Sequence, residues 1–498
     1  MTFLVLGPVL IAAGWIVAAL LSPYPFAAAV PFILAQFALT TLLLGLLAVS
    51  RKVWKETGPD TTAFVALHGL IYYGFANVVP VFFRDTRPLE LKLLMEERIP
   101  EAGLAAYAGA TLAAIGLVAG AALGARIVLA AAGEIRLRAG ENRRIPWLPG
   151  ASTSAGILAV LVVVVLAGSA RFGLDFAVTL SDENVRELGL LDQLLLHGLF
   201  WFLPLGPSLA ATVYLQARRP RRATTVILVA TSVILVAVVA VWRMRSTAMI
   251  AAALPFLLLG LTGRIDIRKW FGAVAVLLAV SYAAVTAVRI SDLETLVTTS
   301  RGRPLDSSEV RDAVARRSGD QTVAGRAFFD FSYRAAGLEP VAALCEAQEK
   351  GQLRLQGGRV VVAGFLQSLP ARLRPQQDLP LRVKTAPAVL GVFGEGDWVT
   401  TFLSEAVLSF GIWATVLYGF AAGLLIALIE RLLVLFGSRP LFEGFLILRY
   451  AFLLYFVTAG ADLATMTALF FKATIGYLAM FVLVGAIVQA VATPRRPA

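Results

Sequence analysis

Long apolar runs, separated by short charged loops, recur through this chain and restrict its fold more than any other feature. A run of about 20 apolar residues is long enough to cross a bilayer as a helix. Lipid offers no other partner to backbone N–H and C=O groups, and the sequence lacks strands of alternating polarity. With 58% hydrophobic and 15% charged residues, one or two soluble domains are excluded. We therefore predict an all-α, polytopic helical membrane protein.

The hydropathy pattern predicts twelve transmembrane spans. They lie near residues 3–21, 26–49, 61–80, 101–124, 151–170, 192–215, 223–241, 247–263, 270–288, 398–429, 443–460 and 464–491. The first span lacks the basic segment of a cleaved signal peptide, so it is predicted to remain in the mature protein.

Basic residues concentrate in alternate loops between these spans. Six such loops occur, at 51–55, 126–144, 218–222, 263–269 and 430–439 and in the C-terminal tail. By the positive-inside rule these loops are cytoplasmic, which places both termini in the cytoplasm. The net charge of +12 follows from this topology and does not indicate a nucleic-acid partner.

The largest outer loop, 289–397, divides the chain into three predicted domains: 1–288 with nine spans, the loop itself, and 398–498 with three spans. Connections of this length are usually functional or disordered, and the hydrophobicity of this one argues against disorder. Within it, AGRAFFDFSYRAAGLEPVAALCEAQEKG has amphipathic spacing and predicts a helix lying on the membrane face. The following GGRVVVAGFLQSLPARLRPQQD predicts an interfacial or re-entrant segment.

Cysteine and histidine are too scarce for a metal centre. The single cysteine, Cys345, excludes an internal disulfide, and it cannot form a familiar zinc cluster with the two histidines. We predict no metal and no cofactor.

Several polar residues lie inside predicted spans. His68, among apolar and aromatic neighbours, is predicted to be a hydrogen-bonded core residue, whereas His197 lies nearer an outer end, where a catalytic role stays open. Arg449 and Lys472 are expected to have structural roles, by snorkelling or by pairing, for Lys472 with Asp462.

Glu405 lies in the apolar tenth span, within GDWVTTFLSEAVLSFGIWATVLYGF. An ionised carboxylate at the edge of the hydrocarbon costs on the order of a few kcal/mol unless a cation, a hydrogen bond or water meets it. The preceding loop is rich in arginine, and Arg334 or Arg326 is the predicted partner. A basic outer loop that ends in a buried acid indicates a site for an anionic, membrane-anchored substrate.

Arg243 and Arg245 occupy an outer hairpin of a few residues, where the positive-inside rule disfavours basic side chains. Snorkelling to lipid headgroups explains them without any function. The functional interpretation is a diphosphate clamp, because planar guanidinium groups bind phosphate oxygens through paired hydrogen bonds and stay charged. Arg289, at the outer end of the ninth span, is a further candidate for the clamp.

These segments resemble a known family of membrane enzymes. WRMRSTAMIAAALPFLLL, and FLQSLPARLRP followed by the Glu405 span, are similar to segments of the O-antigen polymerase-like family of oligosaccharide repeat-unit polymerases. The shared features are Leu369-Pro370, Glu405, Phe410-Gly411, Gly419 and Gly423. The hairpin WRMRS departs from the family in lacking the glycine that often accompanies the arginine.

The resemblance implies a glycosyltransferase of the membrane-embedded GT-C type at the outer face of a bacterial inner membrane. Its substrate would be an oligosaccharide carried on a polyprenyl diphosphate, and its partners the bilayer and, as a further candidate, a chain-length regulator. The family's outer-loop arginines would correspond to Arg243, Arg245, Arg289 and Arg334.

Glycosyl transfer from a diphosphate carrier needs stabilisation of an anionic leaving group and removal of a proton from the acceptor hydroxyl. The arginines can supply the first, and Glu405, Asp330 or Asp397 can supply the second. The sequence shows no metal-binding carboxylate pair in a soluble domain, so metal-independent chemistry is expected.

Two alternatives stay open. An O-antigen ligase shares the architecture and the donor but carries a histidine in its large outer loop, and this loop contains none. A lipid-linked oligosaccharide flippase or another transporter would show internal repeats, whereas the halves of this chain are unequal.

Overall fold

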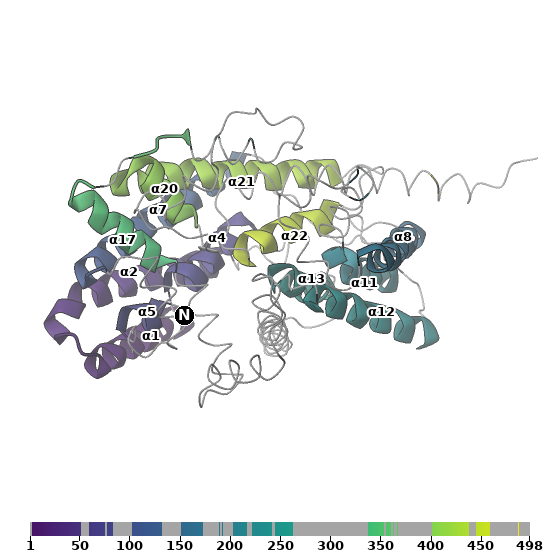
Figure 1. Ribbon diagram of the computed structural model, residues 1–498, viewed down its shortest axis with the longest axis horizontal. Coiled ribbons are helices and arrows are strands. Elements are labelled where there is room, and N and C mark those ends of the chain that lie inside the picture. Colours follow the sequence, from purple (N-terminus) through teal and green to yellow (C-terminus); the bar gives the residue numbers. More distant parts are fainter. Residues whose placement is uncertain are drawn as a thin grey trace, which may run out of the picture. The chain divides into compact units, whose positions relative to one another are not determined.

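The computed structural model describes sixteen helical elements and a few turns, with no strand among the described residues (Figure 1). The described residues are 2–50, 59–74, 77–82, 102–131, 151–172, 189, 192, 203–216, 222–241, 245–261, 337–352, 355–359, 362, 366, 401–437, 445–458 and 487. The prediction of an all-α chain is confirmed for this part of the protein.

Four of the described helices are long and apolar enough to cross a membrane: Phe26–Ser50, Leu104–Ala131, Ala151–Gly168 and Ile412–Leu433. They support a helical membrane protein. The predicted spans at 270–288 and 464–491 lie outside the described residues, apart from residue 487, so the count of twelve stays a prediction.

The chain forms two compact units. The first comprises residues 1–137, 328–432 and 456–469, and the second 138–327, 433–455 and 470–498. The predicted domain boundaries at 288 and 397 fall outside the described residues. Part of the long loop thus belongs to the same unit as the first spans and the Glu405 span.

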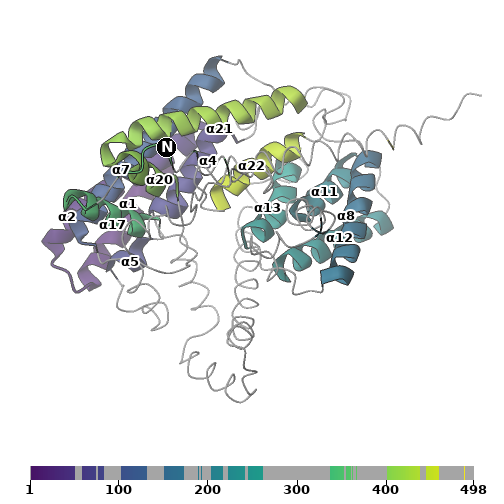
Figure 2. The ribbon, with the colours of Figure 1, turned by 45° about the horizontal axis from the view of Figure 1, so that its top comes forward.

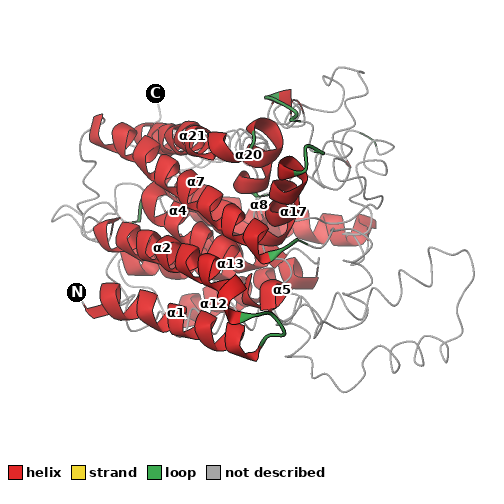
Figure 3. Cartoon of the chain, turned by 90° about the vertical axis from the view of Figure 1, so that its left-hand side faces the viewer, coloured by secondary structure: helices red, strands yellow, loops and turns green. Residues whose placement is uncertain are grey.

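The first unit holds most of the described helices. They are α1 (Thr2–Leu21), α2 (Phe26–Ser50), α4 (Thr61–Gly69), the π-helix η1 (Leu70–Gly74), α5 (Val78–Phe82), α7 (Leu104–Ala131), α17 (Leu338–Glu349), α20 (Phe402–Phe410), the 3-10 helix η7 (Ile412–Ala414) and α21 (Thr415–Gly437), whose last residues belong to the second unit. Helix α2 packs against α1, α4 and α7, and α17 packs against α7 and α20 (Figure 3). Edge-to-face contacts join the rings of Trp15, Phe32, Phe82 and Tyr107.

The described residues of the second unit are also mainly helical (Figure 2). Its elements are α8 (Ala151–Phe172), the 3-10 helix η5 (Leu203–Leu205), α11 (Gly206–Gln216), α12 (Arg222–Val241), α13 (Arg245–Leu261) and α22 (Phe445–Thr458), whose last residues, from Phe456, belong to the first unit. Helix α11 lies at the centre of the group, because it packs against α8, α12 and α13.

Glycines bring α7 and α21 into backbone contact. A Cβ atom at Gly120 would lie 2.9 Å from the Phe420 nitrogen and still closer to the Val416 carbonyl oxygen. Gly124 faces the next turn of α21, and Gly423 faces the α7 backbone at Ala121, so the two helices run in the same direction. Lipid contact is as apolar as helix contact, so close packing over small residues is a main source of association in a membrane.

Two predicted spans are not continuous α-helices, and the expectation of one helix over the tenth span is corrected. The third span changes from α4 to the π-helix η1, and the tenth is broken between α20 and η7 at Gly411. Of the helix expected on the membrane face, the first part, up to residue 336, lies outside the described residues; the described part, α17 from Leu338, is not on a membrane face, since its residues to Cys345 are all buried inside the first unit.

Candidate functional site at the broken helix

Gly411 ends α20 and turns the chain into η7. Its φ of 85° and ψ of 173° lie in a region that only glycine enters without strain. Trp413, immediately after the break, is 90% exposed, whereas the residues of α20 from Phe402 to Ser409 are all buried. The tenth span is therefore a short, enclosed helix followed by a longer apolar one.

The first turn of α20 is fixed by a capping box. Thr401 Oγ1 accepts a hydrogen bond from the Ser404 backbone N–H (3.3 Å), and Ser404 Oγ accepts one from the Thr401 N–H (2.8 Å). Glu405 lies in this turn and is 3% exposed, so its expected burial is confirmed. A carboxylate at this end of a helix gains about 0.3–1 kcal/mol from the helix dipole, which offsets only part of the cost of burial.

Backbone N–H groups of the long loop donate hydrogen bonds to carbonyls in the last turn of α20. The backbone N–H of Gln356 donates to the Leu408 carbonyl (3.0 Å), and that of Gly357 donates to the Ser409 carbonyl (2.8 Å). Beyond the break, the Ile412 N–H donates to Gln348 Oε1 of α17 (3.1 Å). A broken helix in a membrane needs such partners, because lipid can supply none for the freed backbone groups.

The start of α17 is bound to the π-helix. The Gly337 N–H donates to the Tyr72 carbonyl (2.9 Å), and the Leu338 N–H donates to Asn77 Oδ1 (3.0 Å). Asn77 Nδ2 donates to the carbonyls of Tyr72 (2.9 Å) and Gly74 (3.1 Å). Helix α17 thus contacts the third predicted span at its π-helical turn and the tenth at its break.

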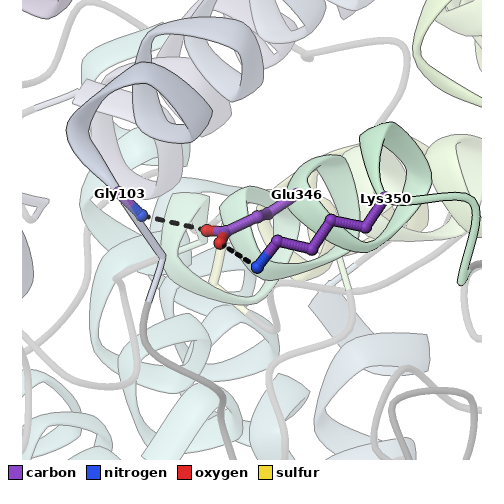
Figure 4. A network of polar contacts seen from close by, with 3 residues as sticks. All are labelled: Gly103, Glu346 and Lys350. Carbon is purple, nitrogen blue, oxygen red and sulfur yellow. Dashed lines mark hydrogen bonds and ion pairs between the residues drawn. The ribbon is translucent and has the colours of Figure 1, made fainter.

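A second contact joins α17 to the start of α7 (Figure 4). Glu346 Oε2 accepts a hydrogen bond from the Gly103 N–H (3.0 Å), and Oε1 lies 2.6 Å from Lys350 Nζ. The hydrogen bond from Lys350, followed by that from Gly103, lowers the pKa of Glu346. On the same helix, burial raises the pKa of Cys345 to about 12, so its thiol stays neutral and unreactive at neutral pH.

The other end of α21 carries a second buried carboxylate. Glu430, 1% exposed, accepts hydrogen bonds from the Thr61 N–H (2.9 Å) and the Thr61 hydroxyl, and so caps the start of α4. Asp60 accepts bonds from the Ala63 N–H (3.0 Å) and from Ser50 Oγ (2.6 Å) at the same helix start. These contacts give Glu430 a structural role.

Most of the predicted site residues lie outside the described part of the chain. They are the acids Asp330 and Asp397 and the arginines Arg243, Arg289, Arg326 and Arg334. Arg245 is the first residue of α13, and its side chain is not among those described. The pairing of Glu405 with Arg334 or Arg326, and the diphosphate clamp, therefore stay predictions.

The predicted core role of His68 is confirmed, since it is buried and bonded to the Phe456 carbonyl and the Tyr73 hydroxyl. Arg449 is also buried, and its Nη1 donates to the Tyr450 hydroxyl (3.1 Å). His197, Asp462 and Lys472 lie outside the described residues.

Sequence reasoning missed the residues that hold α20 and the break after it, chiefly Tyr73, Gln348 and Gln356. One local signal was available, because threonine, here Thr401, is a favoured residue immediately before the first residue of a helix. The other residues come from distant segments and carry no such pattern.

Comparison with known proteins adds no relative: no family model, curated protein or solved structure matches the chain.

Proposed function

We propose that this protein is a polymerase that joins polyprenyl-diphosphate-linked oligosaccharide repeat units at the outer face of a bacterial inner membrane. The observation that supports it most is Glu405. This carboxylate is buried in the first turn of a short enclosed helix, and backbone groups of the long loop complete that helix. The same stretch carries the sequence resemblance to repeat-unit polymerases.

In the proposed reaction, the hydroxyl of an incoming lipid-linked unit attacks the anomeric carbon of the growing glycan. The bond to the diphosphate carrier breaks, and the carrier leaves with the electron pair. Glu405 accepts the hydroxyl proton, with Asp330 and Asp397 as alternative bases. Arginines among Arg243, Arg245, Arg289, Arg326 and Arg334 stabilise the charge on the leaving diphosphate.

Replacement of Glu405 by glutamine tests this proposal. Glutamine keeps the shape of the side chain but removes its charge and basicity, so the folded variant should accumulate single lipid-linked repeat units. The matched control is Glu349→Gln, which removes an exposed carboxylate from α17. Polymer of normal yield and length from Glu405→Gln, at normal protein level, would show that the carboxylate is dispensable.

One structural feature favours the transporter alternative. Broken helices that are completed by other parts of the protein are common in transporters, and Gly411 breaks the tenth predicted span here. The Glu405→Gln experiment separates the two functions if the side of accumulation is measured. Units stranded by a defective polymerase are open to a glycosidase added to spheroplasts, whereas units stranded by a defective flippase are protected.

A further inference from the structure

A chain of hydrogen bonds runs from the end of α22 through α4 and η1 to the first turn of α20. His68 Nδ1 lies 3.1 Å from the Phe456 carbonyl oxygen, and His68 Nε2 lies 3.2 Å from the Tyr73 hydroxyl. The Leu403 backbone N–H donates to that same hydroxyl (3.3 Å). All of these groups belong to the first unit.

Chemistry fixes the direction of each bond. A carbonyl oxygen only accepts, so His68 Nδ1 carries the hydrogen and Nε2 presents a lone pair. The Tyr73 hydroxyl therefore donates to Nε2, and its oxygen is left to accept from Leu403. One phenol thus links the His68 ring to the first turn of α20.

The histidine and the tyrosine are themselves held firmly. The His68 ring stacks on Phe456 with centroids 4.6 Å apart and packs against Tyr72 and Phe402. The Tyr73 main-chain carbonyl accepts from Gln36 Nε2 (3.0 Å), which also donates to Thr111 Oγ1 (3.2 Å). Tyr73 belongs to a π-helical turn, an arrangement found often at functional sites.

We infer that His68 and Tyr73 are positioning residues that hold the first turn of α20, and with it the Glu405 carboxylate, in its working orientation. The inference rests on the proposed function, since it assigns these residues to the site of that reaction. Leu403 and Glu405 share one helical turn, so the phenol bond limits rotation of the turn. Loss of the bond should misplace the carboxylate without removing it.

The first test is hydrogen exchange of the full-length protein in lipid nanodiscs, which needs no substrate. Tyr73→Phe keeps the ring and removes the hydroxyl, so amide exchange in 402–405 should become at least about tenfold faster. Thr62→Val is the matched control, because Thr62 lies in α4 and its buried hydroxyl has no hydrogen-bond partner among the described residues. Unchanged exchange in Tyr73→Phe, or equal acceleration in both variants, would overturn the inference.

The second test measures polymerisation. Tyr73→Phe should lower kcat roughly ten- to a hundredfold with little change in KM, because misplaced groups slow chemistry more than binding. In a Glu405→Gln background the same change should have little further effect, since the residue it positions is already disabled. A loss of equal size in both backgrounds would mean that Tyr73 does not act through Glu405.

A pair of His68 variants tests the same role in case Tyr73→Phe does not fold. His68→Gln retains one donor and one acceptor and should keep most of the activity, whereas His68→Leu retains neither and should behave like Tyr73→Phe. Equal activity of these two variants would overturn the positioning role. Normal polymer from Glu405→Gln alone would instead defeat the proposed function, while the exchange experiment would still decide whether the phenol holds α20.

Discussion

Helix α7 and the α20–α21 segment are neighbours that satisfy their backbone hydrogen bonds in different ways. Helix α7 runs without interruption from Leu104 to Ala131, so its backbone hydrogen bonds lie within the helix. The α20–α21 segment is broken at Gly411, and its freed groups are satisfied by Gln348, Gln356 and Gly357 of the long loop. Helix α7 therefore needs no distant segment to complete its hydrogen bonds, whereas the α20–α21 segment depends on the long loop.

This dependence explains where the polar side chains gather. A broken helix in lipid leaves backbone groups that need polar partners from other segments, because lipid supplies none. Tyr73, Thr401, Ser404, Glu405 and Gln348 all lie around α20. The break therefore creates a polar environment within an apolar unit, which is the setting a carboxylate base requires.

The largest effect is expected where the two helices touch. Gly120→Ala would place a methyl group against the Val416 carbonyl and should destabilise the protein by about 3 kcal/mol, the upper end for overpacking. Gly109→Ala, in the same helix with open space around it, should be neutral or slightly stabilising. Thermal unfolding in detergent compares the two, and equal melting temperatures would show that the contact is not close.

Removal of the break's own glycine should have the next largest effect. Gly411→Ala forces a side chain into the glycine-only region and toward Gln348 Nε2, at a cost of about 1–3 kcal/mol. Gly358→Ala, which meets no neighbour and needs no unusual φ, is the control. We expect a lower melting temperature and loss of polymer for Gly411→Ala only. A stable, active variant would mean that the chain does not need the break.

A smaller effect is expected from Gln348→Ala, which removes the acceptor of the Ile412 N–H. Leaving this partly buried donor unpaired should cost about 1 kcal/mol. The loss should also loosen α17, which can be followed through the chain's single cysteine, the buried Cys345. Maleimide should label Cys345 faster in Gln348→Ala than in the wild type or in Gln352→Ala, a change at an exposed position. Equal labelling rates in Gln348→Ala and the wild type would show that the hydrogen bond at the break does not help to hold α17 in place.

The same contrast determines what the sequence could predict. Apolar runs are local, so the helical class was predicted correctly, and the observed helices α1, α2 and α8 end near the predicted positions. The break at Gly411 was missed, because the hydropathy of an apolar run is the same whether the helix is continuous or broken. The partners of the break, such as Gln348, lie tens of residues away, and hydropathy does not record which loop will meet which helix. Burial of Glu405 was predicted from one charge in an apolar run, but its neighbours were not.

The smallest effect concerns the hydrogen bond that Glu346 of α17 accepts from Gly103, the residue before α7. The lowered pKa of Glu346 means that its contribution to stability is complete above the ordinary glutamate pKa and is lost as the pH falls through the lowered value. Because the pair with Lys350 is largely exposed, the contribution should be only about 0.2–1 kcal/mol. Glu346→Gln should therefore be slightly less stable than the wild type at neutral pH, and the two should converge in acid. Melting curves at several pH values measure this, with Glu349→Gln as the control for loss of a charge. A difference in melting temperature between Glu346→Gln and the wild type that persists at low pH would contradict this prediction. The effect would then come from packing of α17 against α7 and not from the charge of Glu346.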